Sequence, residues 1–439
     1  MIAFVTLFLG LVAGPQTVEV AAGETVAAVE LRLDGAPVAR LEAPPWRAEI
    51  DLGRELMPHR LLAVAFDAAG EEVARAEQWL NLPQPPAGAS VLIEEPAGGG
   101  PTVARLAWQS LAGASPQQIL VTFDGQPLTV TDPARIELPP HDRRALHFLR
   151  AEVIFSANVS SVVEVTFGGV YADRVSSELT AIPLRPRGGK RRLRDPAQLR
   201  GVLVENGRPL EVVAVDHGPA IAVIVPDRRA LPLIDELGRS LLRDRRVTRM
   251  VGLWERFRTW ASLKGRQSVR LLWPVSRRQR TVGGLYDLFP ASETFPAGSH
   301  GLLYLLQGIS RPPQLDDGRQ RLSDAVANAG LEAASRRRAR AVVLLTSGEP
   351  EDASVFDPGR VRRFLERLRV PLHVWALEEP QASAAWGEVH DVSNPTRLAR
   401  AANLLARDLD GQWIVWLDGI HLPQDVGLAP GVEDLAPVP

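Results

Sequence analysis

Two short runs of aliphatic residues constrain the fold of this chain more than any other feature. They are Ala220–Val225 (AIAVIV) and Ala341–Thr346 (AVVLLT), and each is apolar at almost every position. A strand with one solvent-exposed face alternates apolar and polar residues, whereas a strand inside a parallel sheet is buried on both faces. The two runs therefore predict a parallel sheet in the C-terminal half of the chain.

Neighbouring parallel strands need a crossover connection, which is usually a helix. Between and after the two runs, apolar residues recur with helical spacing. The predicted helices are Leu231–Leu242, Val247–Leu263, Leu322–Arg336, Val361–Leu368 and Thr396–Leu409, and the further strands are Ser268–Val275, Val370–Leu377 and Trp413–Leu417. This alternation predicts a doubly wound, Rossmann-like α/β domain over residues 199–426.

An internal repeat predicts a different architecture for the N-terminal half. Val29–Val38 (VELRLDGAPV) is repeated as Ile119–Leu128 (ILVTFDGQPL), and each copy is an alternating strand followed by an Asp-Gly turn. His59 and His147 recur at nearly the same offset. We therefore expect two tandem immunoglobulin-like β-sandwiches, over residues 17–83 and 88–184. The histidines are interpreted as residues that satisfy turn backbone groups, because no other metal ligand or catalytic partner recurs with them.

The first residues favour export. Ile2–Ala13 (IAFVTLFLGLVA) is an uncharged apolar run with the length of a signal-peptide core, and it is too short to span a membrane. Residues 1–16 are predicted to be a signal peptide, and a buried first strand is the alternative. The chain has no cysteine, which excludes disulfides and thiolate metal sites and fits either a cytoplasmic protein or an exported bacterial one.

Charge and composition identify a boundary and a tail. The net charge of −2 favours neither nucleic acid nor anionic lipid as a partner of the whole chain. A basic run with glycine and proline, residues 185–198, is predicted to be a linker between the second sandwich and the α/β domain. Residues 427–439, rich in proline, glycine and acidic residues, are predicted to be a flexible tail.

Two ordered motifs resemble a known family. The first motif resembles the helix and central strand of the von Willebrand factor A-type domain, and it lies at Arg321–Glu349 (RLSDAVANAGLEAASRRRARAVVLLTSGE). The second motif resembles the segment that precedes this domain in an acidobacterial group of exported proteins, and it lies at Leu199–Asp216 (LRGVLVENGRPLEVVAVD). The resemblance covers residues 199–426. It implies an α/β domain with a metal-ion-dependent adhesion site.

In that family the site holds Mg²⁺ through an Asp-x-Ser-x-Ser motif, a threonine and the aspartate of a Thr-Asp-Gly motif. Here Asp227 matches the first aspartate, but Arg229 and Leu231 stand at the two serine positions. The threonine position falls near Gln320, and Ser347 replaces the second aspartate. A guanidinium group repels a divalent cation, so we expect a degenerate site without metal or cofactor.

What remains is a rim at the carboxyl ends of the strands, where ligands of such sheets bind. We hypothesise that Arg228 or Arg229 replaces the metal charge and binds an acidic side chain of a partner protein. The alternative is an inert rim in which Arg229 pairs with Glu349 or Asp352. The candidate binding residues are Asp227, Arg228, Arg229, Ser347, Glu349 and Asp352.

The function predicted from the sequence is that of an exported, non-catalytic binding, adhesion or scaffold protein. Its partner would be another protein, in association with the cell envelope, and not nucleic acid. Two alternatives stay open, a purely structural envelope protein and a hydrolase of surface polymers with an unrecognised site. The usual sequence motifs of phosphate loops, serine hydrolases and zinc proteases are absent, and Ser299-His300 is an isolated pair.

Overall fold

In a computed structural model, the chain forms two compact units. The first comprises Met1–Pro83, Leu179–Arg278 and Tyr286–Pro439, and the second comprises Gln84–Glu178 and Gln279–Leu285. The structure describes residues 2–4, 6, 8, 10–22, 26–83, 87–94, 101–110, 115–133, 135–142, 147–156, 159–167, 179–187, 193, 196–243, 267–281, 284–296, 319–348 and 350–439. The predicted helix at Val247–Leu263 and the pair Ser299-His300 lie outside these residues.

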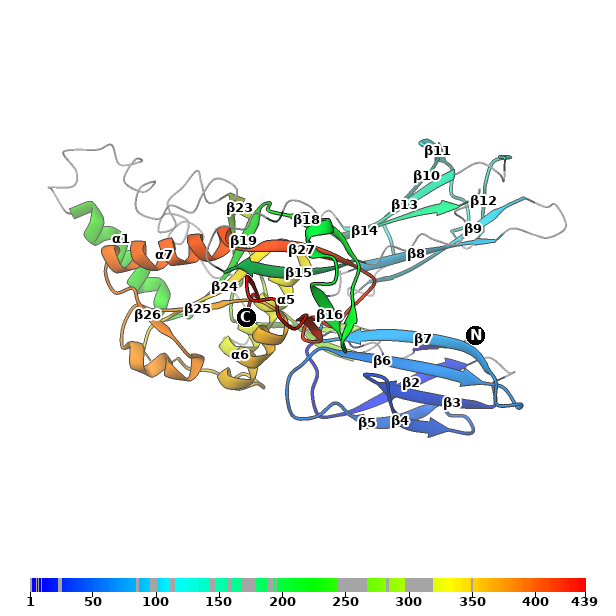
Figure 1. Ribbon diagram of the computed structural model, residues 1–439, viewed down its shortest axis with the longest axis horizontal. Helices are drawn as coiled ribbons and strands as arrows, with labels where there is room; N and C mark the ends of the chain where they lie inside the picture. Colours follow the sequence, from blue (N-terminus) through cyan, green and yellow to red (C-terminus); the bar gives the residue numbers. More distant parts are fainter. Residues whose placement is uncertain are drawn as a thin grey trace. The chain divides into compact units, whose positions relative to one another are not determined.

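The first unit begins with a β-sandwich of two antiparallel sheets (Figure 1). Alternate residues of both sheets point inward, and the core includes Val18, Leu31, Ile50 and Leu61. One sheet has the order β1-β2-β5, and the other has the order β4-β3-β6-β7. The strands are β1 (Ile2–Phe4), β2 (Pro15–Ala22), β3 (Ala28–Leu33), β4 (Ala36–Leu41), β5 (Arg47–Asp51), β6 (His59–Phe66) and β7 (Glu72–Leu80).

The N-terminal apolar segment contributes to this sandwich. β1 pairs antiparallel with β2, and Ile2 and Phe8 are buried in the sandwich core. The backbone N–H of Phe8 donates to Gln78 Oε1 at 2.7 Å. In the structure, the described residues of this segment thus include a buried first strand, which is the alternative to a signal peptide. Export of the chain stays a prediction.

The second unit contains the other copy of the repeat, again as two antiparallel sheets around a core that includes Leu106, Val121, Leu149 and Phe155. One sheet has the order β11-β10-β13-β14, and the other has the order β12-β9-β8. The strands are β8 (Ala87–Glu94), β9 (Val103–Ser110), β10 (Gln118–Phe123), β11 (Gln126–Leu128), β12 (Ile136–Glu137), β13 (His147–Ser156) and β14 (Val159–Phe167).

The two repeated signals, the Asp-Gly turn and the histidine, contact each other in both copies. His59 Nδ1 lies 2.7 Å from Asp34 Oδ2, and His147 Nδ1 lies 2.7 Å from Asp124 Oδ2. Each aspartate adopts a positive φ in the hairpin turn, where aspartate is tolerated better than most residues. Each histidine therefore pairs with the carboxylate of its turn, and His147 also contacts a backbone group, since its Nε2 lies 2.8 Å from the carbonyl oxygen of Asp142.

The pair in the second copy predicts a pH dependence of stability. The hydrogen bond with Asp124 raises the pKa of His147 above its ordinary value. Since the folded state holds the proton more tightly than the unfolded state, this contribution is present at low pH and is lost as the pH rises through the folded pKa. We expect a loss of less than about 1 kcal/mol, because Asp124 is partly solvated.

Urea unfolding of the wild type and of Asp124→Asn at about pH 5.5 and about pH 8.5, values that bracket the histidine range, measures this contribution. The wild type should lose more stability than the variant between the two pH values. An equal loss in both proteins would show that the pair has no such role.

The two aliphatic runs are neighbouring parallel strands, buried along their whole length. β19 (Ala220–Pro226) pairs in parallel with β24 (Ala339–Thr346). They lie inside a six-stranded sheet of order β23-β20-β19-β24-β25-β26, in which only the β20–β23 pair is antiparallel. The other strands are β20 (Gln267–Leu271), β23 (Phe295–Pro296), β25 (Leu372–Ala376) and β26 (Val389–Asp391).

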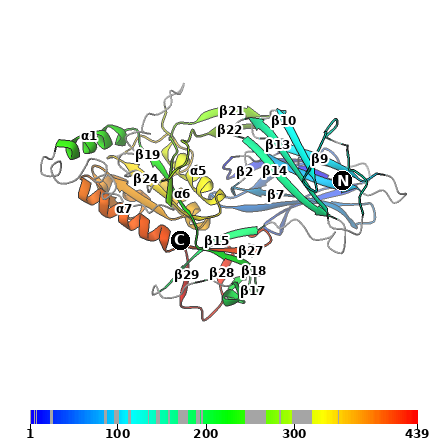
Figure 2. The ribbon, with the colours of Figure 1, turned by 90° about the horizontal axis from the view of Figure 1, so that it is seen from above.

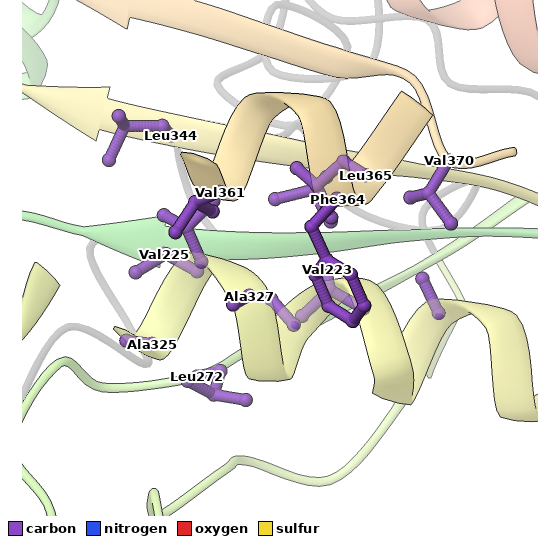
Figure 3. Close-up of a cluster of buried hydrophobic side chains, with 14 of the residues drawn as sticks. Val223, Val225, Leu272, Ala325, Ala327, Leu344, Val361, Phe364, Leu365 and Val370 are labelled. Atoms are coloured by element: carbon purple, nitrogen blue, oxygen red, sulfur yellow. The ribbon is translucent and has the colours of Figure 1, made fainter. Parts of the chain in front are cut away.

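Helices cover both faces of this sheet (Figure 2). α5 (Leu322–Ser335) and α6 (Pro358–Arg367) pack on one face, and α1 (Ala230–Arg243) and α7 (Pro395–Asp410) pack on the other. Figure 3 shows side chains of α5 and α6 meeting Val223, Val225 and Leu344 of the strands. A Cβ on Gly330 of α5 would overlap the side-chain end of Leu365 in α6, so a larger residue there would force that side chain to move.

The rest of the first unit is an antiparallel β module with a core of its own. It consists of a four-stranded sheet of order β18-β27-β15-β29 and a three-stranded sheet of order β17-β16-β28. The strands are β15 (Leu179–Pro186), β16 (Leu203–Glu205), β17 (Arg208–Pro209), β18 (Val212–Asp216), β27 (Trp413–Asp418), β28 (Val426–Leu428) and β29 (Leu435–Pro437). The remaining elements are the ribbon β21 (Arg277–Thr281) and β22 (Gly284–Leu288), and two 3-10 helices, η2 (Pro196–Leu199) and η4 (Pro380–Trp386).

This module corrects the fold class predicted from the sequence. The chain is mostly β, with 43% strand and 19% helix, so two sandwiches followed by a doubly wound α/β domain is the wrong description. β27, expected as the last strand of the parallel sheet, pairs antiparallel with β15 and β18 instead. Its Val415 and Leu417 are buried against Ile182 and Leu184 of β15. The apolar pattern of β27 does not indicate which strands, so distant in the chain, it pairs with.

The predicted linker and tail also contribute to the module. Within residues 185–198, Arg185 of β15 forms an ion pair with Asp408 of α7, and Leu193 is buried. Within residues 427–439, β29 pairs with β15, and Leu435 and Val438 are buried. Apolar burial thus fixes parts of both segments. Among the described residues, no helix is long and apolar enough to cross a membrane.

Candidate functional site

The candidate site lies where β19 and β24 end. Asp227 follows β19, and Ser347 follows β24. Because the strands are parallel neighbours, their carboxyl ends meet at one edge of the sheet, and the backbone N–H of Asp227 donates to the carbonyl of Leu345 at 2.7 Å. The structure therefore brings together the two residues that the sequence placed at the ends of separate strands.

The carboxylate of Asp227 is buried and accepts hydrogen bonds from several protein donors. The side-chain amide of Gln320 donates to Oδ1 at 2.9 Å, and the backbone N–H of Arg229 lies 3.3 Å from the same oxygen. The hydroxyl and the backbone N–H of Ser347 each lie 3.4 Å from Oδ2. A buried carboxylate needs such donors, because desolvation without them is costly.

Gln320, which is not among the binding residues predicted from the sequence, makes further hydrogen bonds at the site. Its amide nitrogen also donates to the carbonyl of Glu351 at 2.8 Å, and its side-chain oxygen accepts from the backbone N–H of Arg228 at 2.9 Å. One side chain thus links the end of β19 to the segment after β24. The resemblance places Gln320 near the threonine position of the metal motif, but it gives no indication of these contacts.

The two arginines of the site have different surroundings. Arg228 is exposed, and its backbone is held by Gln320. Arg229 Nη2 donates to Glu351 Oε1 at 3.0 Å, and the side chains of Arg229 and Glu351 are 56% and 88% exposed. The acidic partner that the structure shows is therefore Glu351, and not Asp352 as the sequence alternative had it. Glu349, the other predicted partner, lies outside the described residues.

Asp352 is directed to the start of α5 and not to Asp227. Its carboxylate accepts from the backbone N–H groups of Leu322 and Ser323, at 2.8 and 3.0 Å, and from the Ser323 hydroxyl at 2.6 Å. The first N–H groups of a helix have no partner inside the helix, and they favour a negative charge. Asp352 is thus a helix cap supplied from another segment.

A second carboxylate, that of Asp324, fastens the same segment to α5. Asp324 is buried and accepts from the guanidinium of Arg321 at 2.6 and 2.8 Å. It also accepts from the backbone N–H groups of Val355 and Phe356, at 3.1 and 3.2 Å. Residues 351–356, which we call the rim loop, are therefore fixed by Asp352 and Asp324. The loop presents Glu351 and also Val355, which is 71% exposed.

These residues do not fit the magnesium site that the family resemblance implied. Magnesium is bound by several oxygen ligands in an octahedron. At Asp227 the amide nitrogen of Gln320 is directed at the carboxylate, and the carboxylates of Asp352 and Glu351 are engaged elsewhere. Among the residues that the structure describes, no three histidine or acidic side chains are grouped as metal ligands.

Comparisons with known proteins add little. No protein family matches the chain, and no curated protein does. A fibronectin(III)-like module structure of Clostridium thermocellum CbhA is 14% identical, over 18% of this chain and 93% of its own, with a TM-score of 0.17. Proximal thread matrix protein 1 from the mussel byssus is 14% identical over 51% of this chain and 50% of its own, with a TM-score of 0.27. Likenesses this weak carry no functional argument.

Proposed function

We propose that this chain is a non-catalytic, exported protein that binds an acidic side chain of a protein partner through Arg229, without a metal ion. The observation that supports the proposal most is the division of charge at the site. The carboxylate of Asp227 is buried and bonded to Gln320 and Ser347, while the guanidinium of Arg229 lies at the surface beside Glu351. The group that would meet a partner's carboxylate at this site is therefore the guanidinium of Arg229.

The ion pair between Arg229 and Glu351 is of a kind in which a partner's carboxylate could take the place of Glu351. Solvent-exposed ion pairs contribute about 0–1 kcal/mol, so a partner's carboxylate would displace Glu351 at little cost. Arg229 would then bind that carboxylate with two parallel hydrogen bonds, a geometry that lysine lacks. Glu351 is in this sense an internal stand-in for the ligand.

The rim loop supports binding in a second way. Because Asp324 and Asp352 fix its backbone, little conformational entropy would be lost when a partner docks on it. The exposed Val355 adds an apolar contact beside the charged pair. The resemblance of residues 199–426 to the von Willebrand factor A family and the association with the cell envelope stay predictions of the sequence.

The test starts from a phage-displayed library of linear peptides, selected on the full chain in the presence of EDTA. We expect enrichment of peptides that contain aspartate or glutamate. Fluorescence anisotropy with an enriched peptide should then show a loss of about tenfold in affinity for Arg229→Ala, equivalent to about 1.4 kcal/mol. Arg229→Lys should recover only part of the loss, and Glu351→Ala should bind more tightly than the wild type.

Arg75→Ala is the matched control, because Arg75 is also an exposed arginine paired with a glutamate, Glu72, and it lies in the first sandwich. This variant should bind like the wild type. Enrichment without acidic residues, or equal affinity of Arg229→Ala and the wild type, would contradict the proposal.

A further inference from the structure

An exposed glutamate, Glu379, extends the rim by one strand. It lies shortly after the end of β25, which pairs with β24 on the side away from β19. The backbone N–H of Gly348, the residue after Ser347, donates to the carbonyl of Glu378 at 3.3 Å. The carboxyl ends of β19, β24 and β25 therefore form one continuous edge, and Glu379 shares this edge with Asp227.

The carboxylate of Glu379 lies beside Gly348. A Cβ on Gly348 would lie 3.6 Å from Glu379 Oε2, so the side chain is directed back toward the end of β24. The segment that carries it is fixed from below, because the buried hydroxyl of Ser383 in η4 lies 3.3 Å from the buried hydroxyl of Thr346. The carboxylate is thus presented at the rim by an anchored segment.

The backbone of Glu379 is strained. Its φ of 42° and ψ of 63° lie in the left-handed region, and Pro380 follows it. Glycine or asparagine adopts this conformation more readily than glutamate does. Within the parts of the chain that the structure describes, no side chain forms an ion pair with the carboxylate of Glu379. No described contact therefore explains a glutamate at this position, and strained residues of this kind are concentrated at binding sites.

The three strand ends carry their charges in a fixed order. Arg229 follows β19, the uncharged Ser347 and Gly348 follow β24, and Glu379 follows β25. Neighbouring strands lie about 4.8 Å apart, so the ends of β19 and β25 lie about 10 Å apart. A guanidinium and a carboxylate at this separation would match two opposite charges on one segment of a partner.

We propose that the partner of this rim presents a dipolar segment, in which an acidic residue meets Arg229 and a basic residue meets Glu379. This inference rests on the proposed function, since the acidic residue is the one that Arg229 binds. An extended chain advances about 3.3 Å per residue, so the two charged residues of the partner would lie about two to four positions apart. Glu379 would repel a second acidic residue and select a basic one, which makes it a specificity-determining residue.

Selection of the phage-displayed library on the wild type and on Glu379→Gln, both with EDTA, tests the proposal. On the wild type we expect lysine or arginine to be enriched at these spacings from the enriched aspartate or glutamate. On Glu379→Gln the acidic residue should still be enriched, and the basic residue should return to its frequency in the unselected library. Glu42→Gln is the matched control, because Glu42 is also exposed and lies in the first sandwich, and it should select the same peptides as the wild type.

Fluorescence anisotropy with one selected dipolar peptide measures the effect. Replacing the basic residue of the peptide by alanine should weaken binding to the wild type about three- to fivefold, as expected for an exposed ion pair, and should not weaken binding to Glu379→Gln. Glu379→Asn, which suits the left-handed backbone, replaces Glu379→Gln if the glutamine variant does not fold.

The outcomes separate this inference from the proposed function. Acidic residues enriched on the wild type without a basic neighbour would overturn the dipolar segment and leave the role of Arg229 standing. The same basic residue selected on Glu379→Gln would overturn it as well. A library without enriched acidic residues would contradict both proposals.

Discussion

Replacing Arg340 by methionine should lower the free energy of unfolding by about 3 kcal/mol, because buried carbonyl groups would lose their donors. Arg340 is buried in β24, and no carboxylate of the described residues forms an ion pair with it. Its burial lowers its pKa to about 10, so it stays charged at neutral pH. Its guanidinium donates to the carbonyls of Leu368 and Arg369, each at 3.2 Å, and reaches that of Ala334 at 3.5 Å.

These carbonyls belong to the carboxyl ends of α5 and α6, where backbone acceptors lack helical donors and the helix dipole is negative. The guanidinium thus ties both helices to the sheet. Urea unfolding followed by circular dichroism measures the change. Arg75→Met is the control, since an exposed arginine should change stability by no more than about 0.5 kcal/mol. Equal stability of Arg340→Met and the wild type would show that the helix ends do not need the guanidinium.

Replacing Asp324 by alanine should cost about 3 kcal/mol as well, and it should also loosen the rim loop. The change removes the carboxylate that pairs with Arg321, and the loss of one partner of a buried pair costs about 3–5 kcal/mol. It also leaves the backbone N–H groups of Val355 and Phe356 without their acceptor. Hydrogen exchange of these two amides should become faster by a larger factor than that of amides in β24.

Asp357→Ala is the control for the rim loop. Asp357 caps α6 by accepting from the backbone N–H of Arg360, so its loss should cost about 1 kcal/mol and leave the amides of Val355 and Phe356 protected. Binding of an acidic peptide should weaken in Asp324→Ala and not in Asp357→Ala. Unchanged exchange at Val355 in Asp324→Ala would mean that other contacts fix the loop.

The sequence predicted those elements whose pattern is local. The runs at Ala220 and Ala341 indicated parallel strands buried on both faces, and β19 and β24 have that burial and direction. The repeat indicated that Asp34 and His59 correspond to Asp124 and His147. It did not show that they touch, because a strand pattern does not specify which turn lies beside its first residue.

What the sequence could not predict depends on distant partners. β27 (WIVWLD) is as apolar as a parallel strand, and its antiparallel pairing with β15 depends on the complementarity of two segments far apart in the chain. The contacts of Gln320 could not be predicted either, because its place near the threonine position of the metal motif does not show that its amide would bond Asp227 and the backbone of Arg228. The degenerate metal motif predicted that Asp227 belongs to the site. The structure shows which donors surround its carboxylate, among them Gln320 and Ser347.

The central claim is that protein donors, and not a metal ion, stabilise the carboxylate of Asp227. Thermal unfolding of the wild type and of Asp227→Asn, each with EDTA and with increasing Mg²⁺ or Mn²⁺, tests this claim most directly. A metal that bound the folded state would raise the melting temperature in a saturable way. We expect no such rise in the wild type. A saturable, metal-dependent rise that disappears in Asp227→Asn would contradict the account.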